Sequence, residues 1–286
     1  MDDVCRLVEL NPVRWEGVTL NRLDIQLRCH RHTLMAVYEA MYDVMAEAWE
    51  VRSWCCRSLA NILYLAPIEE HFTSPRYIYL YRDGRDVACS FRSAVAGEKH
   101  FYHIAKEWDA TQQQALGMRE RIGPGRFVSI SYESLIREPE LTMRLLCKFL
   151  GVRYHPSMLE YYKSDEARRA AESSDLWGNV AKPIMADNTR KFLREVGESD
   201  IRLFESVAGD VLEALGYDCL YAPPGEKTIY SQEEIRQFEA ENLRLKEAVR
   251  QRTRGDDLQR RDRQVSLIQE IRNRGQMSPT SLRAIA

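Results

Sequence analysis

The short stretch YIYLYRDGRDVACSF, residues 77–91, joins an apolar, strand-like run to a cluster of charged residues. Arg82 directly follows the run, and its forked guanidinium matches the geometry of a phosphate or another oxyanion. A helix that begins after Asp83 would direct its positive N-terminal end to the same place, and Ser90 would add a hydroxyl about two turns along. The pattern therefore indicates a local anion site. The alternative is that Arg82 pairs with Asp83 or Asp86 in a surface network, which an isolated RDGRD pattern favours.

A second cluster of titratable residues, AGEKHFYHIAKEWD at residues 96–109, offers groups for proton transfer. Glu98 and His100 are candidates for the base that would deprotonate an attacking hydroxyl or amine, and Glu47 on an earlier helix is a third. His100 and His103 also stand three residues apart on one helical face, which is a metal-ligand spacing. No third type of ligand stands nearby, so we expect no metal. For each histidine alone, a surface or hydrogen-bonded position is the simpler interpretation.

Strands and helices would position these residues. Short β-branched and aromatic runs predict strands at residues 51–56, 77–81 and 127–131. Apolar spacings of three and four predict helices at residues 20–49, 59–72, from 84 onward, 99–122, 138–150 and 201–215. Strands that alternate with helices predict an α/β fold in which helices flank a parallel sheet. Such sheets bind ligands beyond the carboxyl ends of their strands, where Arg82 stands.

The composition excludes several classes of protein. The 286 residues carry a net charge of −2, which gives no broad attraction to nucleic acid or to an anionic membrane surface. No apolar run approaches the roughly 20 residues that a membrane helix needs, and the acidic N-terminus does not resemble a signal peptide. The seven cysteines are scattered and odd in number, so we expect reduced thiols and a cytoplasmic location.

A second motif, FVSISYESLIREPELTMRLLCKFLGV at residues 127–152, combines a strand, a Tyr-Glu-x-Leu turn, a helix that starts with proline and a Phe-Leu-Gly end. With it, the chain resembles the sulfotransferases that use 3′-phosphoadenosine 5′-phosphosulfate (PAPS), over about residues 50–217. The resemblance implies a sulfotransferase or nucleotide-kinase-like fold, PAPS as co-substrate and 3′-phosphoadenosine 5′-phosphate (PAP) as its product. It also implies that Arg82 and Ser90 hold the 3′-phosphate of the donor and that Tyr132 lies near the adenine and this phosphate.

A third block, NTRKFLREVGESDIRLFESVAGDVLEALGY, is similar to the C-terminal segment of the same family. It places Arg190 and Lys191 where the family has basic residues that close over the 3′-phosphate. Near the first predicted strand, WCCRSLANILYLAPIEEHF is similar to a family segment whose Lys-Ser or Lys-Thr pair stabilises the bridging oxygen of the donor. Arg57 takes the position of that lysine and would carry the same charge spread over a plane.

One element of the family pattern is absent from the sequence. Family members hold the 5′-phosphosulfate in a loop rich in Gly, Ser and Thr that joins a strand to a helix. Neither G-x-x-x-x-G-K-[ST] nor a Pro-x-Ser-Gly-Thr-Thr run occurs, and Gly17 is the only glycine before Gly84. We therefore expect a domain that is incomplete on its N-terminal side and a chain that transfers sulfuryl slowly or not at all.

The composition changes near residue 225, which predicts a sulfotransferase-like α/β domain at 1–225 and a charged helical extension at 226–286. In the extension, a heptad seam predicts an extended helix, and its members are Ile235, Phe238, Asn242, Leu245 and Val249. The seam covers only about two heptads, so two interpretations stay open: a solvated helix, and a homodimer through a coiled coil. Residues 278–286 are expected to be disordered.

Three hypotheses of function follow from these patterns. The first is a PAPS-dependent sulfotransferase that transfers a sulfuryl group to a hydroxyl or amine of a small molecule, glycan or peptide. Its catalytic residues would be Arg57, Glu98 and His100, and positioning and charge would carry the catalysis without a metal. The second is a non-catalytic relative that interacts through its C-terminal helix. The third, a nucleotide kinase, is disfavoured because the sequence lacks the phosphate loop and its lysine.

Overall fold

The computed structural model describes residues 1–11, 15–225 and 228–276. Contacts within the chain divide it into two compact units. The first unit comprises Met1–Thr73, Glu172–Ser174 and the segment from Arg254 onward, and the second comprises Ser74–Ala171 and Asp175–Thr253. The predicted domain boundary near residue 225 stays a prediction, and the predicted disordered end at residues 278–286 lies outside the described residues.

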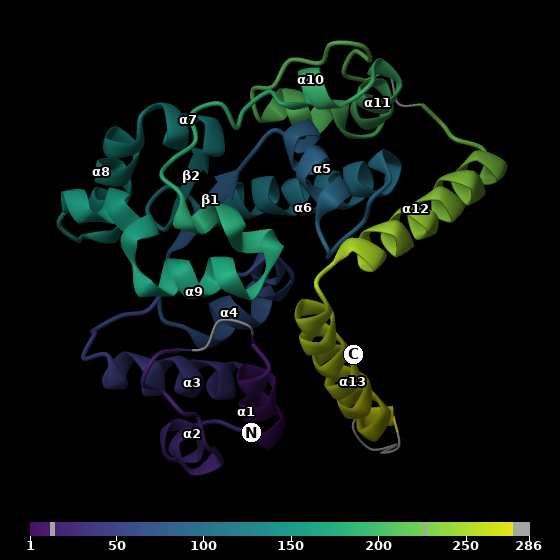
Figure 1. The fold of residues 1–286 in the computed structure, drawn as a ribbon. Coiled ribbons are helices and arrows are strands. Elements are labelled where there is room, and N and C mark those ends of the chain that lie inside the picture. The colour runs from purple at the N-terminus through teal and green to yellow at the C-terminus, as the bar shows by residue number, and fades with distance from the viewer. Residues whose placement is uncertain (12–14, 226–227, 277–286) are drawn as a thin grey trace. The chain divides into compact units, whose positions relative to one another are not determined.

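The second unit is built on a two-stranded parallel sheet. Strand β1 (Tyr77–Tyr81) pairs along its whole length with β2 (Phe127–Ser131), and the first residues of the two strands stand opposite each other. Both strands match the predicted ranges. The crossover that joins them consists of α5 (Gly84–Ser93) and α6 (Phe101–Ile122) (Figure 1). Parallel strands that are joined through helices confirm the predicted α/β fold.

Helices make up most of the rest of the second unit. Between β2 and the C-terminal segment the chain forms α7 (Tyr132–Arg137), α8 (Pro139–Leu150), a 3-10 helix (Pro156–Lys163), α9 (Asp165–Ser173), a second 3-10 helix (Asp175–Ala181), α10 (Phe192–Glu195) and α11 (Glu198–Ala214). The Phe-Leu-Gly end noted in the second motif closes α8, because Gly151 follows it in the left-handed conformation at φ +74°.

The core of the second unit lies where α5, α6 and α11 pack together beside the strands (Figure 1). Trp108 of α6 and Phe204 of α11 are buried in it. Gly84 begins α5 directly against these two rings: a Cβ at this position would lie 2.5 Å from Cζ of Phe204 and 2.7 Å from Cδ2 of Trp108. The glycine therefore lets the N-terminus of α5, and the end of β1 before it, approach the core closely.

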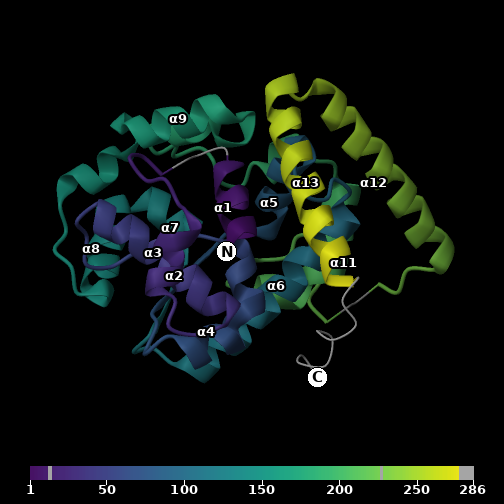
Figure 2. The same cartoon turned by 90° about the horizontal axis from the view of Figure 1, so that it is seen from below.

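The first unit is helical among its described residues. Its elements are α1 (Asp2–Glu9), α2 (Arg22–Arg28), α3 (Leu34–Ala48), a 3-10 helix (Leu59–Tyr64), α4 (Leu65–His71) and α13 (Gly255–Gln276). Figure 2 shows α2 beside α3, and residues of α1, α2 and α3 share one apolar cluster. The helix predicted at 20–49 is therefore two helices, because Thr33 caps the start of α3 by accepting from the amide of Ala36.

The strand predicted at residues 51–56 is wrong, since this segment has no strand pairing in the structure. Its side chains hold it to α3 instead. The ring of Trp54 stacks on Tyr42 with centroids 4.5 Å apart, and its Nε1 donates to Asp43 Oδ1 at 3.1 Å. Trp54, one of the residues that suggested a strand, therefore packs on a helix, and no neighbouring strand is needed to hold this segment.

The predicted C-terminal helix is present and is divided at Thr253 into α12 (Gln232–Arg252) and α13. The heptad seam is the inward face of α12: Asn242 and Val249 are buried, and Phe238 is partly buried. This face contacts residues of α6 in the same chain. The homodimer through this helix stays a prediction, and two of the seam side chains, Phe238 and Asn242, contact residues of the chain itself.

Candidate functional site

Arg82 stands directly beyond the carboxyl end of β1, and only 17% of its side chain is exposed. Its Nη2 donates to the backbone oxygen of Asn188 at 2.6 Å and reaches Oδ1 of the same residue at 3.3 Å. The guanidinium lies over the ring of Tyr132, 4.4 Å from its centroid. Nε of Arg82 is buried and has no hydrogen-bond partner among the described residues. A buried donor without a partner costs free energy, so an anion at this nitrogen would be favourable.

Tyr132 begins α7, immediately after β2, and lies next to Arg82 because the two parallel strands end side by side. Asn188 connects the two residues: besides accepting from Arg82, it donates from Nδ2 to the hydroxyl of Tyr132 at 2.8 Å. One amide side chain therefore fixes both the arginine and the aromatic ring.

Ser90 lies in α5 and contacts the segment that carries Arg190 and Lys191. Its hydroxyl accepts from Nζ of Lys191 at 2.9 Å and donates to the backbone oxygen of Asp86 at 3.2 Å. The backbone amide of Arg190 donates to Oδ2 of Asp86 at 2.7 Å, and the same oxygen lies 3.8 Å from Nη2 of Arg82. The five residues predicted to hold the co-substrate therefore lie in one connected cluster: Arg82, Ser90, Tyr132, Arg190 and Lys191. Their binding role stays a prediction.

The second arginine of RDGRD has a different role. Arg85 is 3% exposed and forms ion pairs with Asp83 at 2.8 Å and with Glu205 of α11 at 2.6 Å. Its guanidinium also lies 4.2 Å from the ring centroid of Phe192. Asp83 is thus paired with Arg85. Of the two pairings suggested as an alternative for Arg82, the one with Asp86 is present at 3.8 Å, but it joins largely buried side chains rather than a surface network.

Glu133, the acidic residue of the Tyr-Glu-x-Leu motif, connects the sequence motifs to each other. Its Oε1 accepts from the backbone amide of Asp83 at 3.2 Å, and its Oε2 accepts from the hydroxyl of Tyr217 at 2.7 Å. Burial and this hydrogen bond raise the pKa of Tyr217 far above its usual range, so the phenol stays protonated and donates. The three blocks noted in the sequence therefore meet at the carboxyl ends of β1 and β2.

Glu98, one of the two predicted bases, lies in the loop before α6 and contacts α12. It forms an ion pair with Lys246 at 2.7 Å and accepts from Nδ2 of Asn242. Burial raises the pKa of Glu98, but the hydrogen bonds from Lys246 and Asn242 outweigh burial and lower it. A carboxylate with a lowered pKa is a weaker base, so the visible role of Glu98 is to hold α12.

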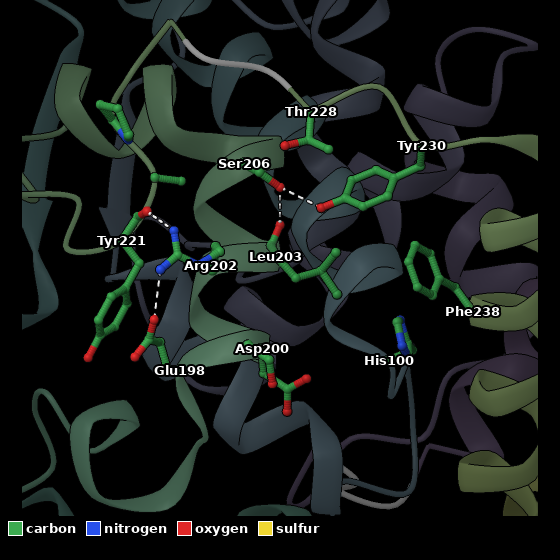
Figure 3. A pocket seen from close by; sticks show the side chains of 13 residues that line it. His100, Glu198, Asp200, Arg202, Leu203, Ser206, Tyr221, Thr228, Tyr230 and Phe238 are labelled. Carbon is green, nitrogen blue, oxygen red and sulfur yellow. Dashed lines mark hydrogen bonds and ion pairs between the residues drawn. The ribbon is translucent and has the colours of Figure 1, made fainter.

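His100, the other predicted base, caps the start of α6 by accepting from the amide of Tyr102 at 3.3 Å. Its ring stacks on Phe238 of α12 with centroids 4.8 Å apart, and burial lowers its pKa. His100 and Phe238 line one side of a cavity of about 790 Å³, and Arg202 lines the other (Figure 3). These contacts explain why the residue is held in place, and a catalytic role for His100 or Glu98 stays a prediction.

Arg57, the third predicted catalytic residue, belongs to the first unit. It is exposed, in an extended segment just before Ser58, which caps the following 3-10 helix. Glu47, a further base candidate, also lies in this unit and pairs with Arg28. The catalytic roles suggested for Arg57 and Glu47 stay predictions.

Of the residues in the cluster, Asn188 was missed in the sequence, and Asp86 was noted only as a possible partner of Arg82. Both stand inside motifs that pointed to the site: Asn188 opens the NTRK block, and Asp86 is the second aspartate of RDGRD. Their polar side chains next to predicted phosphate ligands were the available signal. The contacts of Asn188 with Arg82 and of Asp86 with Arg190 join residues about a hundred positions apart, so spacing alone gave no way to find them.

Three further properties of the described residues bear on the chemistry. No three His, Cys, Asp or Glu side chains among them form a group that could hold a metal ion. None of the helices placed by the structure has both the length and the apolar character needed to cross a membrane. All seven cysteines carry free thiols.

Comparison with known proteins gives the family. The family described as "Sulfotransferase family" matches residues 10–156, just over half of the chain. Protein-tyrosine sulfotransferase A of Caenorhabditis elegans is 28% identical over 166 residues, which cover 55% of this chain and 43% of the relative. Protein-tyrosine sulfotransferase of Drosophila melanogaster is 25% identical over 166 residues, covering 54% of this chain and 32% of the relative. The chain thus spans less than half the length of either relative.

Among solved structures, the sulfotransferase domain from the curacin biosynthetic pathway is similar, with a TM-score of 0.48 and 22% identity. The similarity covers 64% of this chain and 69% of that domain. The match to the family over residues 10–156 includes β1, α5, β2 and Tyr132, which are the elements that assemble the cluster around Arg82. On this match, the chain belongs to the sulfotransferase family.

Proposed function

We propose that this protein is a sulfotransferase that uses PAPS as the sulfuryl donor, with PAP as the product. The observation that carries the proposal is the guanidinium of Arg82, which lies over Tyr132 with its buried Nε unpartnered among the described residues. An arginine in this state favours an oxyanion, and the tyrosine ring beside it favours a planar base. A nucleotide with a phosphate on its ribose offers both groups.

The charges around Arg82 support a phosphate rather than a carboxylate. Lys191 brings a second cation to the same cluster, and the hydroxyl of Ser90 adds a donor that can turn toward a ligand. Arg190 is held there by its backbone amide. The N-terminus of α5 directs its dipole toward the end of β1. The residues present therefore fit a dianionic 3′-phosphate.

When bound, PAPS would supply the sulfuryl group, and the residues of this chain would bind and orient the donor. The cations would hold the ribose phosphate and so fix the position of the nucleotide relative to an acceptor. We propose a tyrosine hydroxyl in a protein or peptide as the acceptor, because the relatives found are named protein-tyrosine sulfotransferases. We expect slow turnover, since Arg57 stands where the family has lysine and no phosphosulfate loop motif occurs in the sequence.

The proposal is tested by calorimetry with two nucleotides that differ in one group: PAP, and 5′-AMP, which lacks the 3′-phosphate. We expect PAP to bind at least tenfold more tightly than 5′-AMP. A charge-assisted hydrogen bond contributes about 1.5–3 kcal/mol. The substitution Arg82→Ala should therefore lower the affinity for PAP by roughly 10- to 100-fold and leave the affinity for 5′-AMP nearly unchanged.

Arg121→Ala is the matched control. Arg121 is exposed in the last turn of α6, before β2 begins, and therefore lies at the opposite end of the strands from Arg82. The Arg121→Ala variant should bind PAP as tightly as the wild type does. If wild-type protein shows no PAP binding at millimolar concentration, the donor site is refuted. Transfer from labelled PAPS to a tyrosine peptide then separates an enzyme from a non-catalytic relative that only binds.

A further inference from the structure

The segment that carries Arg190 and Lys191 is anchored by one buried carboxylate. Asp86 of α5 is fully buried, and its Oδ2 accepts from the backbone amide of Arg190 at 2.7 Å. Its Oδ1 accepts from the backbone amide of Phe192 at 3.1 Å. Both oxygens of one side chain are thus used to hold two amides that lie two residues apart.

This anchoring compensates for an unfavourable backbone conformation. Arg190 has φ +51°, in the left-handed region, which costs a residue other than glycine about 1–2 kcal/mol. In this conformation the amides of Arg190 and Phe192 both point at Asp86. The residue between them, Lys191, then directs its Nζ to Ser90 at 2.9 Å. The bend held by Asp86 therefore decides where Lys191 points.

Asp86 also contacts the other part of the cluster. Its Oδ2 lies 3.8 Å from Nη2 of Arg82, and Arg82 donates to Asn188 at the start of the same segment. One carboxylate thus stands between the arginine at the end of β1 and the lysine of the 188–192 segment.

We propose that Asp86 is a positioning residue that sets Arg82 and Lys191 for one shared anion, the 3′-phosphate of the donor. This inference rests on the proposed function. Asp86 does not touch the phosphate, because a carboxylate would repel it and because its oxygens are occupied by the two amides. Burial raises the pKa of Asp86, so its ionised form is stabilised by these two amides and by Arg82. The carboxylate, the two amides and the arginine therefore support one another.

The test is Asp86→Asn, assayed by the ratio of PAP to 5′-AMP affinity. Asparagine keeps the shape but replaces one acceptor oxygen by a donor that faces an amide, so the bend at Arg190 should lose an anchor. We expect the ratio to fall about tenfold, with 5′-AMP affinity changed by less than about twofold.

Glu205→Gln is the matched control. Glu205 is another buried carboxylate that holds a backbone segment, because it accepts from the amides of Leu220, Tyr221 and Ala222. It also pairs with Arg85, which keeps its second partner Asp83 in this variant. The substitution Glu205→Gln should lower the melting temperature as Asp86→Asn does, and it should leave the ratio of PAP to 5′-AMP affinity unchanged. A drop of the ratio in both variants would mean that general loosening, rather than positioning, is responsible, and the inference would fail.

The outcomes separate the inference from the function on which it rests. If the wild type does not distinguish PAP from 5′-AMP, the proposed function fails. If the wild type does and Asp86→Asn retains the ratio, only the inference fails. Should Asp86→Asn not fold, hydrogen exchange of the wild-type protein decides: the amides of Arg190 and Phe192 should exchange slowly without ligand, and fast exchange at both overturns the inference.

Discussion

Replacing Asn242 by leucine distinguishes two interpretations of α12, because they predict opposite signs. In a coiled coil, an asparagine at a core position specifies register and lowers stability, so leucine would stabilise a dimer. In the structure, Oδ1 of Asn242 accepts from the backbone amides of Lys99 at 2.8 Å and His100 at 3.0 Å. Here leucine would remove the acceptor of two amides, and we expect a less stable protein.

The magnitude follows from the burial of the two amides. Asn242 is 4% exposed and Lys99 is 1% exposed, so water cannot readily replace the lost acceptor at Lys99, whereas His100 is partly exposed. A buried donor left without a partner costs about 1–3 kcal/mol, which gives about 2–4 kcal/mol for the pair. The leucine side chain returns about 1 kcal/mol by apolar burial. The expected decrease in the free energy of unfolding is therefore about 1–3 kcal/mol.

Urea denaturation of Asn242→Leu measures this change, and sedimentation in the ultracentrifuge reports the mass. Leu243→Ala is the control, because Leu243 is the next residue and is 59% exposed; its effect should stay within about 0.5 kcal/mol. Hydrogen exchange at the amides of Lys99 and His100 should accelerate in Asn242→Leu alone. A variant that is more stable than the wild type and sediments as a dimer would refute the packing of α12 on its own chain.

Two further predictions concern buried positions of the second unit. Burial lowers the pKa of Lys99 to about 8, below its usual 10.5. Between these two pH values the unfolded chain binds more protons than the folded protein, so the free energy of unfolding should rise with pH. Urea denaturation between about pH 8 and about pH 10 should show this rise in the wild type and not in Lys99→Met. Thermal melts of Gly84→Ala should show a loss of about 1–3 kcal/mol in stability, because the added Cβ would lie 2.5 Å from Phe204. In the control Gly117→Ala, in α6, the added Cβ would meet nothing within 4 Å, so its stability should be unchanged or higher.

The elements that could be predicted are those whose local pattern and tertiary role agree. The strands at 77–81 and 127–131 combine β-branched and aromatic residues with a partner of equal length, and both formed as expected. The segment at 51–56 has a similar composition, but the aromatic rings of α3 compete for Trp54. Composition alone cannot report such a competitor, because it acts through packing between segments.

The same limit applies to the candidate site. Arg82 and Ser90 were identified from their places after a predicted strand and along the following helix, and Tyr132 from the resemblance to the sulfotransferases. The parallel pairing then brings the strand ends together. Asp86 and Asn188 act through contacts with residues about a hundred positions away, which no local pattern encodes. The heptad seam of α12 left two interpretations open, a solvated helix and a homodimer, and the structure places this face against α6 of the same chain. Periodicity marks the apolar face of a helix but does not name its partner.

The two arginines of RDGRD explain how the cluster keeps a positive charge for an anion. Arg85 is buried with Asp83 and Glu205, and removing one partner from such a group commonly costs about 3–5 kcal/mol, so Arg85 is committed to the fold. Because Arg85 neutralises these carboxylates, Asp86 is the only acidic side chain among the described residues with an ion-pair contact to Arg82, and its oxygens are occupied by backbone amides. Had Arg82 paired with Asp83 instead, a second carboxylate would neutralise its charge, and a phosphate would bind there less favourably. The charge that makes the site suitable for a phosphate therefore depends on the neighbouring arginine, three residues along the chain.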